Sequence, residues 1–249
     1  MNVTVMCVTR DRPEQTRQML QSYRDTTSLF STDIVIVVDA NDPKLEDYRK
    51  VMGDFLSMHS ASGWLQPRSA PGLIVLGDWE TGNLVKATNT AIKRLWWNTD
   101  SIVGHIGDDH RFRTIGWDKR VLETLETPGV AVPNDGTHHG NIPTACFLSM
   151  VIPKALGWLA LPTCTHLYID NAWRSIGEAM AAYRYMPDVL VEHLHPTVGK
   201  SEWDAGYRLN NSDIMFANDR AAWLAWQESG TMAEDMAKIG RAVYERGSD

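Results

Sequence analysis

Two carboxylates and a histidine stand together in the stretch HIGDDHRF, where Asp108, Asp109 and His110 follow the apolar run SIVGHI. Adjacent like charges repel each other and lose hydration when buried, so such a pair needs either solvent or a cation. Carboxylate oxygens are the ligands that Mg²⁺ prefers, and Mn²⁺ also accepts imidazole nitrogen. The stretch therefore predicts a Mn²⁺ or Mg²⁺ site, with a solvated acidic turn as the alternative.

A second pair of possible metal ligands, His193 and His195, lies in the segment VLVEHLHP. Residues two apart on a strand point to the same face, so both imidazoles can address one site. The alternative for each is an ordinary hydrogen-bonded side chain at the end of a strand. We expect the metal ligands to come from Asp108, Asp109, His110, His193 and His195.

The elements that must position these residues alternate between strands and helices. Buried strands are predicted at residues 3–8, 34–38, 73–76 and 101–106, and helices at the run that begins at Pro13 and at NLVKATNTAIKRLWW. This order is typical of an α/β fold with a largely parallel sheet. Ligands of such sheets bind at the carboxyl ends of the strands, where Asp39 and Asp108 both fall.

The second half of the chain has a different pattern. The segment VAVP at 130–133 precedes a polar loop over 134–144, a helix is predicted from Asp170 to Tyr183, and a strand then runs to Pro196. Residues after about 200 are predicted to be mainly helical. No Gly-, Ser- or Pro-rich linker separates two units. We therefore expect one mixed-sheet domain over 1–200, with halves at 1–110 and 111–200, and a helical extension over 201–249.

Composition excludes several classes of protein. The formal charge of −7 over 249 residues argues against a protein that coats nucleic acid. The three cysteines form no CxxC pair, which favours reduced thiols in a cytoplasmic protein. The longest apolar region is interrupted by Pro153 and Lys154, so neither a membrane span nor a membrane partner is expected.

The chain resembles glycosyltransferases of the GT-A fold, in a layout similar to that of the large inverting family 2. Five segments carry the resemblance in matching order: VTVMCVTRDRPE, VVDANDP, GNLVKATNTAI, GDDH, and YIDNAWRSIG followed by VEHLHP. They cover roughly residues 1–197. The resemblance implies a Rossmann-like sheet flanked by helices, a nucleotide-sugar donor and a divalent cation that bridges its two phosphates.

The resemblance also implies a set of donor-binding residues: Thr9, Arg10, Asp39, Lys86, Asn89, Asp108 and Asp109. Asp39 would accept a hydrogen bond from uracil or ribose, which favours a UDP-sugar; an Asx-turn with Asn41 and Asp42 is the alternative. Surface-exposed basic residues are the alternative for Arg10 and Lys86. The family pattern is Asp-any-Asp, whereas this chain has Asp-Asp-His, so two registers of the acidic motif stay open.

The catalytic base implied by the resemblance is Asp170, in YIDNAW. A sugar hydroxyl is a poor nucleophile at neutral pH, and a positioned carboxylate can take its proton as it attacks. A structural N-cap of the following helix is the alternative, because aspartate serves well there. His138 and His139 are weaker candidates, and the loop that carries them is expected to shape the acceptor pocket.

The acceptor and two other functions stay open at this stage. The segment VEHLHPTVGKSEWDAGY resembles small glycosyltransferases of actinobacterial phages, which would make the acceptor a hydroxymethylated pyrimidine in DNA; a small molecule, glycan or protein hydroxyl is equally admissible. Four tryptophans offer stacking surfaces unless they pack in the core: Trp64, Trp158, Trp173 and Trp203. A GT-A-fold binding protein without catalysis is a second reading. A nucleotidyltransferase is a third, which TRDRPE disfavours because it is not a glycine-rich loop.

Overall fold

A computed structural model describes residues 2–29, 31–61, 72–77, 83–95 and 101–247. The strands are β1 (Asn2–Val8), β2 (Thr32–Asp39), β3 (Gly72–Leu76), β4 (Ser101–Ile106), β5 (His110–Phe112), β6 (Val130–Asn134), β7 (Cys146–Ser149) and β8 (Tyr183–His193). The helices are α1 (Pro13–Thr26), α2 (Leu45–Ala61), α3 (Leu84–Arg94), α4 (Trp117–Thr124), α5 (Val151–Leu156), α6 (Ile169–Ala179), α7 (Ala205–Asn210), α8 (Asp213–Glu228) and α9 (Thr231–Arg246).

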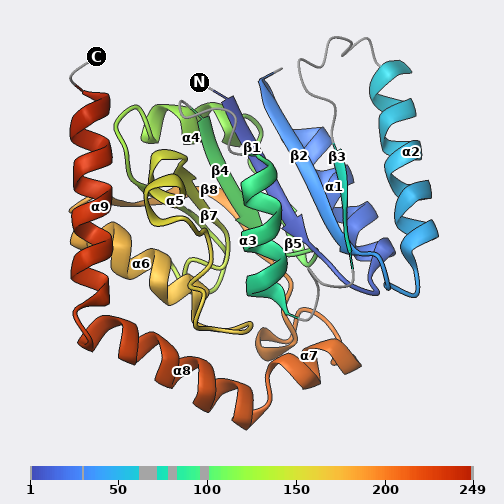
Figure 1. The fold of residues 1–249 in the computed structure, drawn as a ribbon. Helices are drawn as coiled ribbons and strands as arrows, with labels where there is room; N and C mark the ends of the chain where they lie inside the picture. The colour runs from blue at the N-terminus through green and yellow to red at the C-terminus, as the bar shows by residue number, and fades with distance from the viewer. Residues whose placement is uncertain (1, 30, 62–71, 78–82, 96–100, 248–249) are drawn as a thin grey trace.

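The strands form one mixed sheet in the order β3-β2-β1-β4-β7-β6-β8-β5. The first four strands along this order are parallel, β7 runs antiparallel to β4 and β6, and β6 pairs in parallel with β8. Strand β5 closes the order by pairing antiparallel with β8, so that His110 stands opposite His193. The predicted α/β class and mostly parallel sheet are confirmed (Figure 1).

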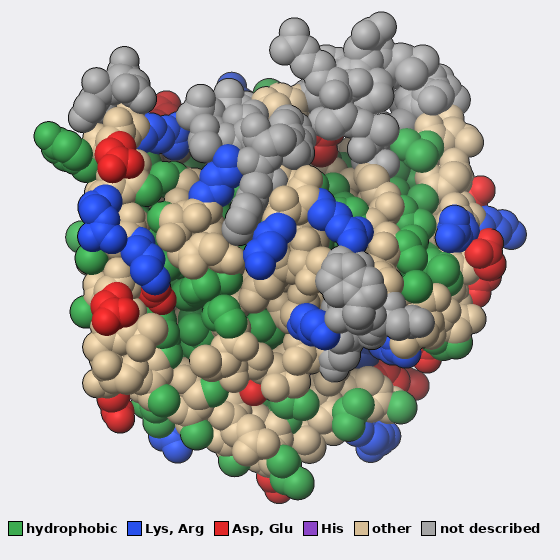
Figure 2. Space-filling model, in the orientation of Figure 1, with side chains coloured by type: hydrophobic (Ala, Val, Ile, Leu, Met, Phe, Trp, Pro, Cys, Tyr) green, Lys and Arg blue, Asp and Glu red, His purple; other side chains and the backbone are tan. Residues whose placement is uncertain are grey.

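The central strands are apolar along their length because helices cover both faces of the sheet. Val5 and Cys7 of β1 pack with α1, α2 and α4, whereas Met6 between them packs with α3, α5 and α6 on the other face. The outer side of α3 is polar, and Lys and Arg side chains are spread over this face of the molecule (Figure 2).

The predicted helix over 170–183 is too long, and the strand after it begins earlier. Helix α6 ends at Ala179, and Ala181 takes a left-handed conformation with φ of 51° that no α-helix continues through. The aromatic stretch from Tyr183 then enters the sheet as β8, which ends at His193 and not at Pro196. Helix α2 was not predicted from the sequence.

The C-terminal helices wrap along the lower and left margins of the molecule in the view of Figure 1. Trp226 of α8 and Ile239 of α9 are buried in the same core cluster as the sheet residues Val103 and Val130. The extension therefore shares the hydrophobic core of the preceding residues. Among the helices of the described residues, none is long and apolar enough to cross a bilayer.

Candidate active site

The carboxyl ends of three neighbouring parallel strands bring the first predicted residues together. The register pairs Val8 with Val37 and Cys7 with Ile106, so β1, β2 and β4 end at one edge of the sheet. Thr9 follows β1, Asp39 ends β2, and Asp108 comes two residues after β4. Side chains that are 99 positions apart in sequence can thus meet directly, as Thr9 and Asp108 do.

Asp108 is a buried carboxylate with two partners from the segment after β1. The hydroxyl of Thr9 donates to its Oδ2 at 2.6 Å, and Nη1 of Arg12 lies 3.4 Å from its Oδ1. Burial raises the pKa of Asp108, the negative charge of Asp109 raises it further, and Arg12 and Thr9 oppose this shift. The side chain of Asp108 is therefore held by Thr9 and Arg12, which follow β1.

Asp109 faces the opposite direction, toward two stacked imidazoles. Its Oδ1 lies 3.2 Å from Nδ1 of His110, its Oδ2 lies 3.3 Å from Nε2 of His193, and the two rings stack with centroids 4.4 Å apart. Burial would raise the pKa of Asp109, but the contacts with both imidazoles lower it well below its usual range. A Cβ at Gly107 would come within 2.5 Å of Oδ1, so glycine at this position leaves room for the carboxylate.

The arrangement of Asp109, His110 and His193 fits a divalent cation. One ligand atom from each residue lies within 4.8 Å of the other two. Each imidazole also has a buried ring nitrogen that finds no hydrogen-bond partner within the described residues, Nε2 of His110 and Nδ1 of His193. Buried polar atoms are rarely left unpaired, so these nitrogens point to a missing ligand, and an Asp-His-His set suits Mn²⁺.

His195 does not join this group. It lies beyond β8, and its Nδ1 accepts from the backbone N–H of Thr197 at 3.2 Å to cap the short 3-10 helix Pro196–Val198. Burial lowers the pKa of His195 to about 4, with the charge of His193 adding to the effect. Its ring packs edge-on against Tyr207 at 4.8 Å, so the structure gives it a packing role beside the cluster.

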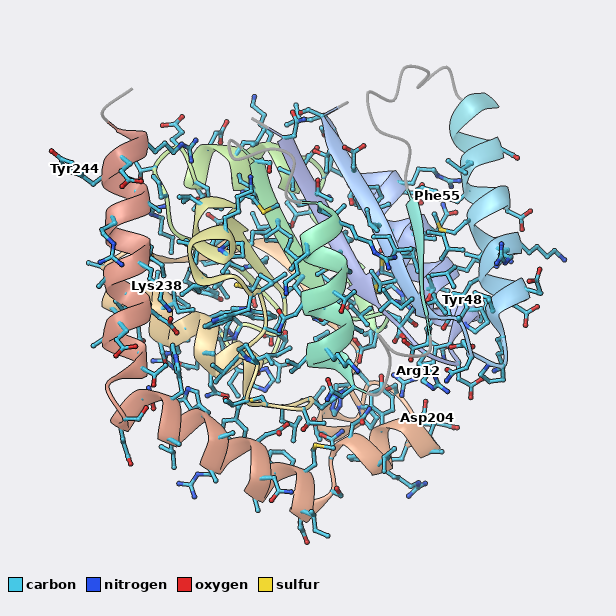
Figure 3. All side chains as sticks on the ribbon, in the orientation of Figure 1. Arg12, Tyr48, Phe55, Asp204, Lys238 and Tyr244 are labelled. Carbon is cyan, nitrogen blue, oxygen red and sulfur yellow. The ribbon has the colours of Figure 1, made fainter. Side chains whose placement is uncertain are left out.

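Helix α7, in the C-terminal extension, contacts Asp109 directly and Asp108 through Arg12. The hydroxyl of Tyr207 donates to Oδ2 of Asp109 at 2.8 Å, and the guanidinium of Arg12 lies 3.7 Å above the tyrosine ring. Nη2 of Arg12 also binds Asp204 at 2.7 Å, and the two side chains are adjacent in Figure 3. Arg12 is thus a cation paired with the carboxylate of Asp108, a position that sequence reasoning did not assign to it.

Arg10 and Asp39 form a separate pair at the same edge. Nη1 of Arg10 binds Oδ2 of Asp39 at 2.9 Å and Oδ1 of Asn41 at 2.8 Å. The Asx-turn of this loop belongs to Asp42, whose Oδ1 accepts from the backbone N–H of Lys44. The carboxylate of Asp39 is therefore not explained by the turn. Burial raises its pKa, and Arg10 opposes the rise.

The two residues predicted on α3 are placed differently. Lys86 is exposed in the first turn, at the same sheet edge as the acidic pair, and its backbone N–H is capped by Asn83. Asn89 holds the segment after α5: its Oδ1 accepts from the backbone N–H groups of Leu159 and Ala160, and its Nδ2 donates to Ala160 O. Three of the hydrogen bonds that this amide can form are thus made to the segment after α5, which gives Asn89 a structural role in the described residues.

Asp170 lies in the first turn of α6 and is half-buried. The N-cap position belongs to Tyr168, so Asp170 does not cap the helix as the alternative proposed. Among the described residues, its carboxylate accepts only from backbone N–H groups, that of Asn171 at 2.9 Å and its own. Burial raises the pKa of Asp170, while backbone N–H groups and the nearby His138 and His193 lower it in part.

The loop after β6 contains a residue pair that the sequence did not predict. Nδ1 of His138 lies 2.6 Å from Oδ2 of Asp135, whose Oδ1 accepts from the backbone N–H groups of Thr137 and His138. These contacts outweigh burial and lower the pKa of Asp135. His139 is exposed, with a left-handed φ of 50°. Of the two histidines, His138 is therefore the one that the contact with Asp135 fixes in place.

The tryptophans divide between core and surface. Trp158 and Trp173 are buried in the core and cannot stack on a ligand. Trp203 is 40% exposed and lies edge-on to His195 at 6.1 Å, and Trp64 lies outside the described residues.

Three solved structures share this arrangement of elements. The mannosyltransferase PcManGT from Pyrobaculum calidifontis, in complex with GDP-Man and Mn²⁺, is 13% identical over 98% of this chain and 86% of that chain, with a TM-score of 0.58. Glucosyl-3-phosphoglycerate synthase from Mycobacterium tuberculosis, in complex with Mn²⁺, UDP and phosphoglyceric acid, is 10% identical over 90% of this chain and 78% of that chain, with a TM-score of 0.55. S. aureus TarS 1–349 in complex with UDP is 12% identical over 93% of this chain and 73% of that chain, with a TM-score of 0.54. The fold is GT-A. No protein-family model and no curated protein matches the sequence, so the similarity rests on the GT-A architecture itself.

Proposed function

We propose that this chain is a metal-dependent glycosyltransferase that moves a sugar from a nucleotide-diphosphate donor to an acceptor hydroxyl. The observation that carries the proposal is the group Asp109, His110 and His193 with its two unpartnered ring nitrogens, at the carboxyl edge of a GT-A sheet. The structurally similar PcManGT and glucosyl-3-phosphoglycerate synthase were solved with Mn²⁺ and a nucleotide, which supports this reading.

The donor would lie along the edge formed by β1, β2 and β4. Asp39 would accept a hydrogen bond from the nucleobase or ribose, and Arg10, its partner at 2.9 Å, would contact the base or a phosphate. Asp108 and Thr9 would face the ribose, and Arg12 and Lys86 supply positive charge for the diphosphate. We propose a UDP-sugar as the donor, with a GDP-sugar as the competing outcome.

A bound Mn²⁺ or Mg²⁺ would neutralise the charge that grows on the diphosphate as it leaves. The residues that would hold it are Asp109, His110 and His193, with Asp108 directed toward the ribose. Because Tyr207 donates to Oδ2 of Asp109, the tyrosine would release that oxygen or turn aside when Asp109 binds a cation directly. His195 would support the ring of His193 and not bind the cation.

Asp170 would act as the general base. The acceptor oxygen attacks the anomeric carbon, its proton passes to the carboxylate of Asp170, and the sugar–phosphate bond breaks with its electron pair leaving on the nucleoside diphosphate. One displacement of this kind inverts the anomeric configuration. The carboxylate suits this role because burial raises its pKa and no side chain of the described residues forms a hydrogen bond with it.

For the acceptor we propose a hydroxymethylated pyrimidine in DNA, on the resemblance of residues 191–207 to phage glycosyltransferases. Within this segment, His193 and Tyr207 contact Asp109, and Trp203 lies edge-on to His195. Transfer of label from donor to hydroxymethylated DNA, with unmodified DNA of the same sequence as control, tests it. Transfer only to free sugars or glycans would reject the DNA acceptor and leave the glycosyltransferase proposal intact.

The donor proposal is tested by calorimetry with UDP and GDP, each with Mn²⁺ and with EDTA, followed by hydrolysis of UDP-GlcNAc and GDP-mannose. We expect one nucleotide to bind much more tightly with Mn²⁺ and its sugar donor to release free sugar slowly. Metal-dependent binding without hydrolysis or transfer would indicate a binding protein of the GT-A fold. Absence of nucleotide binding in both conditions would reject the proposal.

A further inference from the structure

One face of α8 contacts the segment that leads into Asp170. Phe216, Asp219 and Trp223 lie three and four positions apart, which places them on the same side of the helix. Asp219 is only 1% exposed. Its carboxylate accepts hydrogen bonds from three consecutive backbone N–H groups, those of Thr165 at 2.9 Å, His166 at 2.8 Å and Leu167 at 2.7 Å.

The next residue, Tyr168, is held by the rings of the same helix face. Its φ of 61° is left-handed, a conformation that a bulky residue adopts only when its surroundings enforce it. Its ring stacks on Trp223 with centroids 5.6 Å apart and meets Phe216 edge-on at 6.4 Å. Tyr168 is also the N-cap of α6, and its carbonyl accepts from Ala172 N–H. The start of α6 is therefore fixed by α8.

This matters for Asp170 because the residue lies two positions after Tyr168 and no side chain of the described residues forms a hydrogen bond with its carboxylate. Its carboxylate accepts from backbone N–H groups of the same helical turn, that of Asn171 at 2.9 Å and its own, so its direction follows the first turn of α6. The thiol of Cys164 donates to the backbone O of Asp219 at 3.7 Å. Burial raises the pKa of this thiol to about 12, and the charges of Asp219 and Asp170 both add to the rise. The anchor and the carboxylate it orients thus belong to one local unit.

We propose that Asp219, with Phe216 and Trp223, is a positioning residue that holds Asp170 in the geometry of a base. The C-terminal extension is then part of the reaction apparatus through α8 and not only a covering of the core. This inference rests on the proposed function, since it assigns α8 a role in the same transfer. A misplacement of about 1 Å in a reacting group costs about 100-fold in rate, so a backbone anchor at this place has a large effect on turnover.

The matched control is Asp118 of α4, a buried carboxylate that also holds a loop by accepting hydrogen bonds from backbone N–H groups. It is 0% exposed, and its carboxylate accepts from the backbone N–H groups of Ser28 and Leu29 and from the hydroxyl of Thr32. That loop precedes β2, at the edge opposite the candidate site. Asp118→Asn and Asp219→Asn remove the same kind of interaction, and both are expected to lower the melting temperature.

The experiment measures turnover of the donor that the wild type hydrolyses, together with calorimetric binding of UDP or GDP with Mn²⁺. We expect Asp219→Asn to lower kcat about 10- to 100-fold with nucleotide affinity within about threefold of wild type, and Asp118→Asn to leave kcat per folded molecule unchanged. Phe216→Ala, a milder change at a half-exposed ring, should lower kcat in the same sense. It serves as the decisive variant if Asp219→Asn does not fold.

A double-mutant cycle separates positioning from general damage. If Asp219 acts through Asp170, then Asp170→Asn and the double variant Asp170→Asn with Asp219→Asn turn over at the same rate. Equal losses of kcat in Asp219→Asn and Asp118→Asn, or an additive double variant, would overturn the inference. Failure of the wild type to bind nucleotide with Mn²⁺ would instead reject the proposed function, and hydrogen exchange at residues 168–171 would then test the anchoring by itself. Exchange there no faster in Asp219→Asn than in Asp118→Asn would overturn it.

Discussion

Asp109 and Asp170 are the carboxylates to which the proposed transfer assigns metal binding and proton removal, and their hydrogen-bond partners differ. Asp109 is contacted by His110, His193 and Tyr207, and the contacts with the two imidazoles lower its pKa despite burial. Within the described residues, the carboxylate of Asp170 has backbone N–H groups and no side chain as hydrogen-bond partners, and burial raises its pKa. A carboxylate that must stay ionised as a ligand needs the first environment, and one that must accept a proton needs the second. The pair therefore predicts opposite responses to mutation and to pH.

The largest effect is expected from Asp170→Asn. Asparagine keeps the oxygen that accepts from Asn171 N–H but cannot take a proton, so transfer should fall by about 100- to 10,000-fold. Binding of UDP or GDP with Mn²⁺ should stay near that of the wild type, because Asp170 is not a donor contact. Near-normal transfer by Asp170→Asn would show that Asp170 is not the base, and its surroundings would then need no explanation different from those of Asp109. A product that retains the anomeric configuration would reject the inverting displacement alone.

Removal of the metal and substitution of Asp109 should both weaken nucleotide binding. Removing the metal with EDTA should weaken nucleotide binding by about 10- to 100-fold, and Asp109→Asn should remove most of the dependence on Mn²⁺, because a ligand and the partner of two imidazoles is lost. Calorimetry with and without Mn²⁺ measures both. Equal affinities in EDTA and Mn²⁺ for the wild type would contradict the metal assignment.

The raised pKa of Asp170 gives a pH dependence with a definite sign. The base must be ionised, so the rate should fall about tenfold for each pH unit below the pKa of Asp170, with a midpoint above the usual range of aspartate. The raised pKa also means that ionisation opposes folding, a stability loss that appears as pH rises through this pKa. Asp170→Asn should therefore melt no lower than the wild type at neutral pH. A wild-type rate that is flat through the acid range would argue against Asp170 as the base.

The smallest of these effects is expected from Asp39→Ala. Loss of a hydrogen bond to the nucleotide should weaken binding by about tenfold, whereas the exposed pair with Arg10 contributes at most about 1 kcal/mol to stability. Melting temperature and nucleotide affinity, measured on the same preparation, distinguish the two roles. A lower melting temperature with unchanged affinity would show that Asp39 serves only the loop.

The sequence predicted those features that depend on local pattern and on strand ends. Runs such as IVIVV and SIVGHI specify buried strands, and parallel strands bring the residues that follow them, Thr9, Asp39 and Asp108, to one edge. The pairing of His193 with the acidic motif was predicted from its place on a strand. His195 was included by the same rule, but β8 ends at His193, so the strand alternation on which the rule depends does not extend to His195.

The features that escaped prediction depend on contacts between distant segments. Arg12 and Arg10 share the stretch TRDRPE, and only the start of α1 at Pro13 turns Arg12 toward Asp108. Tyr207 and Asp109 are 98 positions apart in the sequence, and the hydrophobic pattern of α7 does not predict a contact between them. Asn89 fitted a shared helix face with Lys86, but tertiary packing uses its amide to hold the chain after α5.

The contact of Arg12 with Asp204, across 192 positions, bears on the order in which the site is made. Chains emerge from the ribosome N-terminus first, and the sheet strands up to β8 are complete at residue 193. At that stage Arg12 still lacks the carboxylate of Asp204, and Asp109 lacks the hydroxyl of Tyr207. The charges beside the acidic motif are thus matched only after residue 207 has been synthesised, so the nascent protein can hold a nearly finished sheet before it holds a finished site.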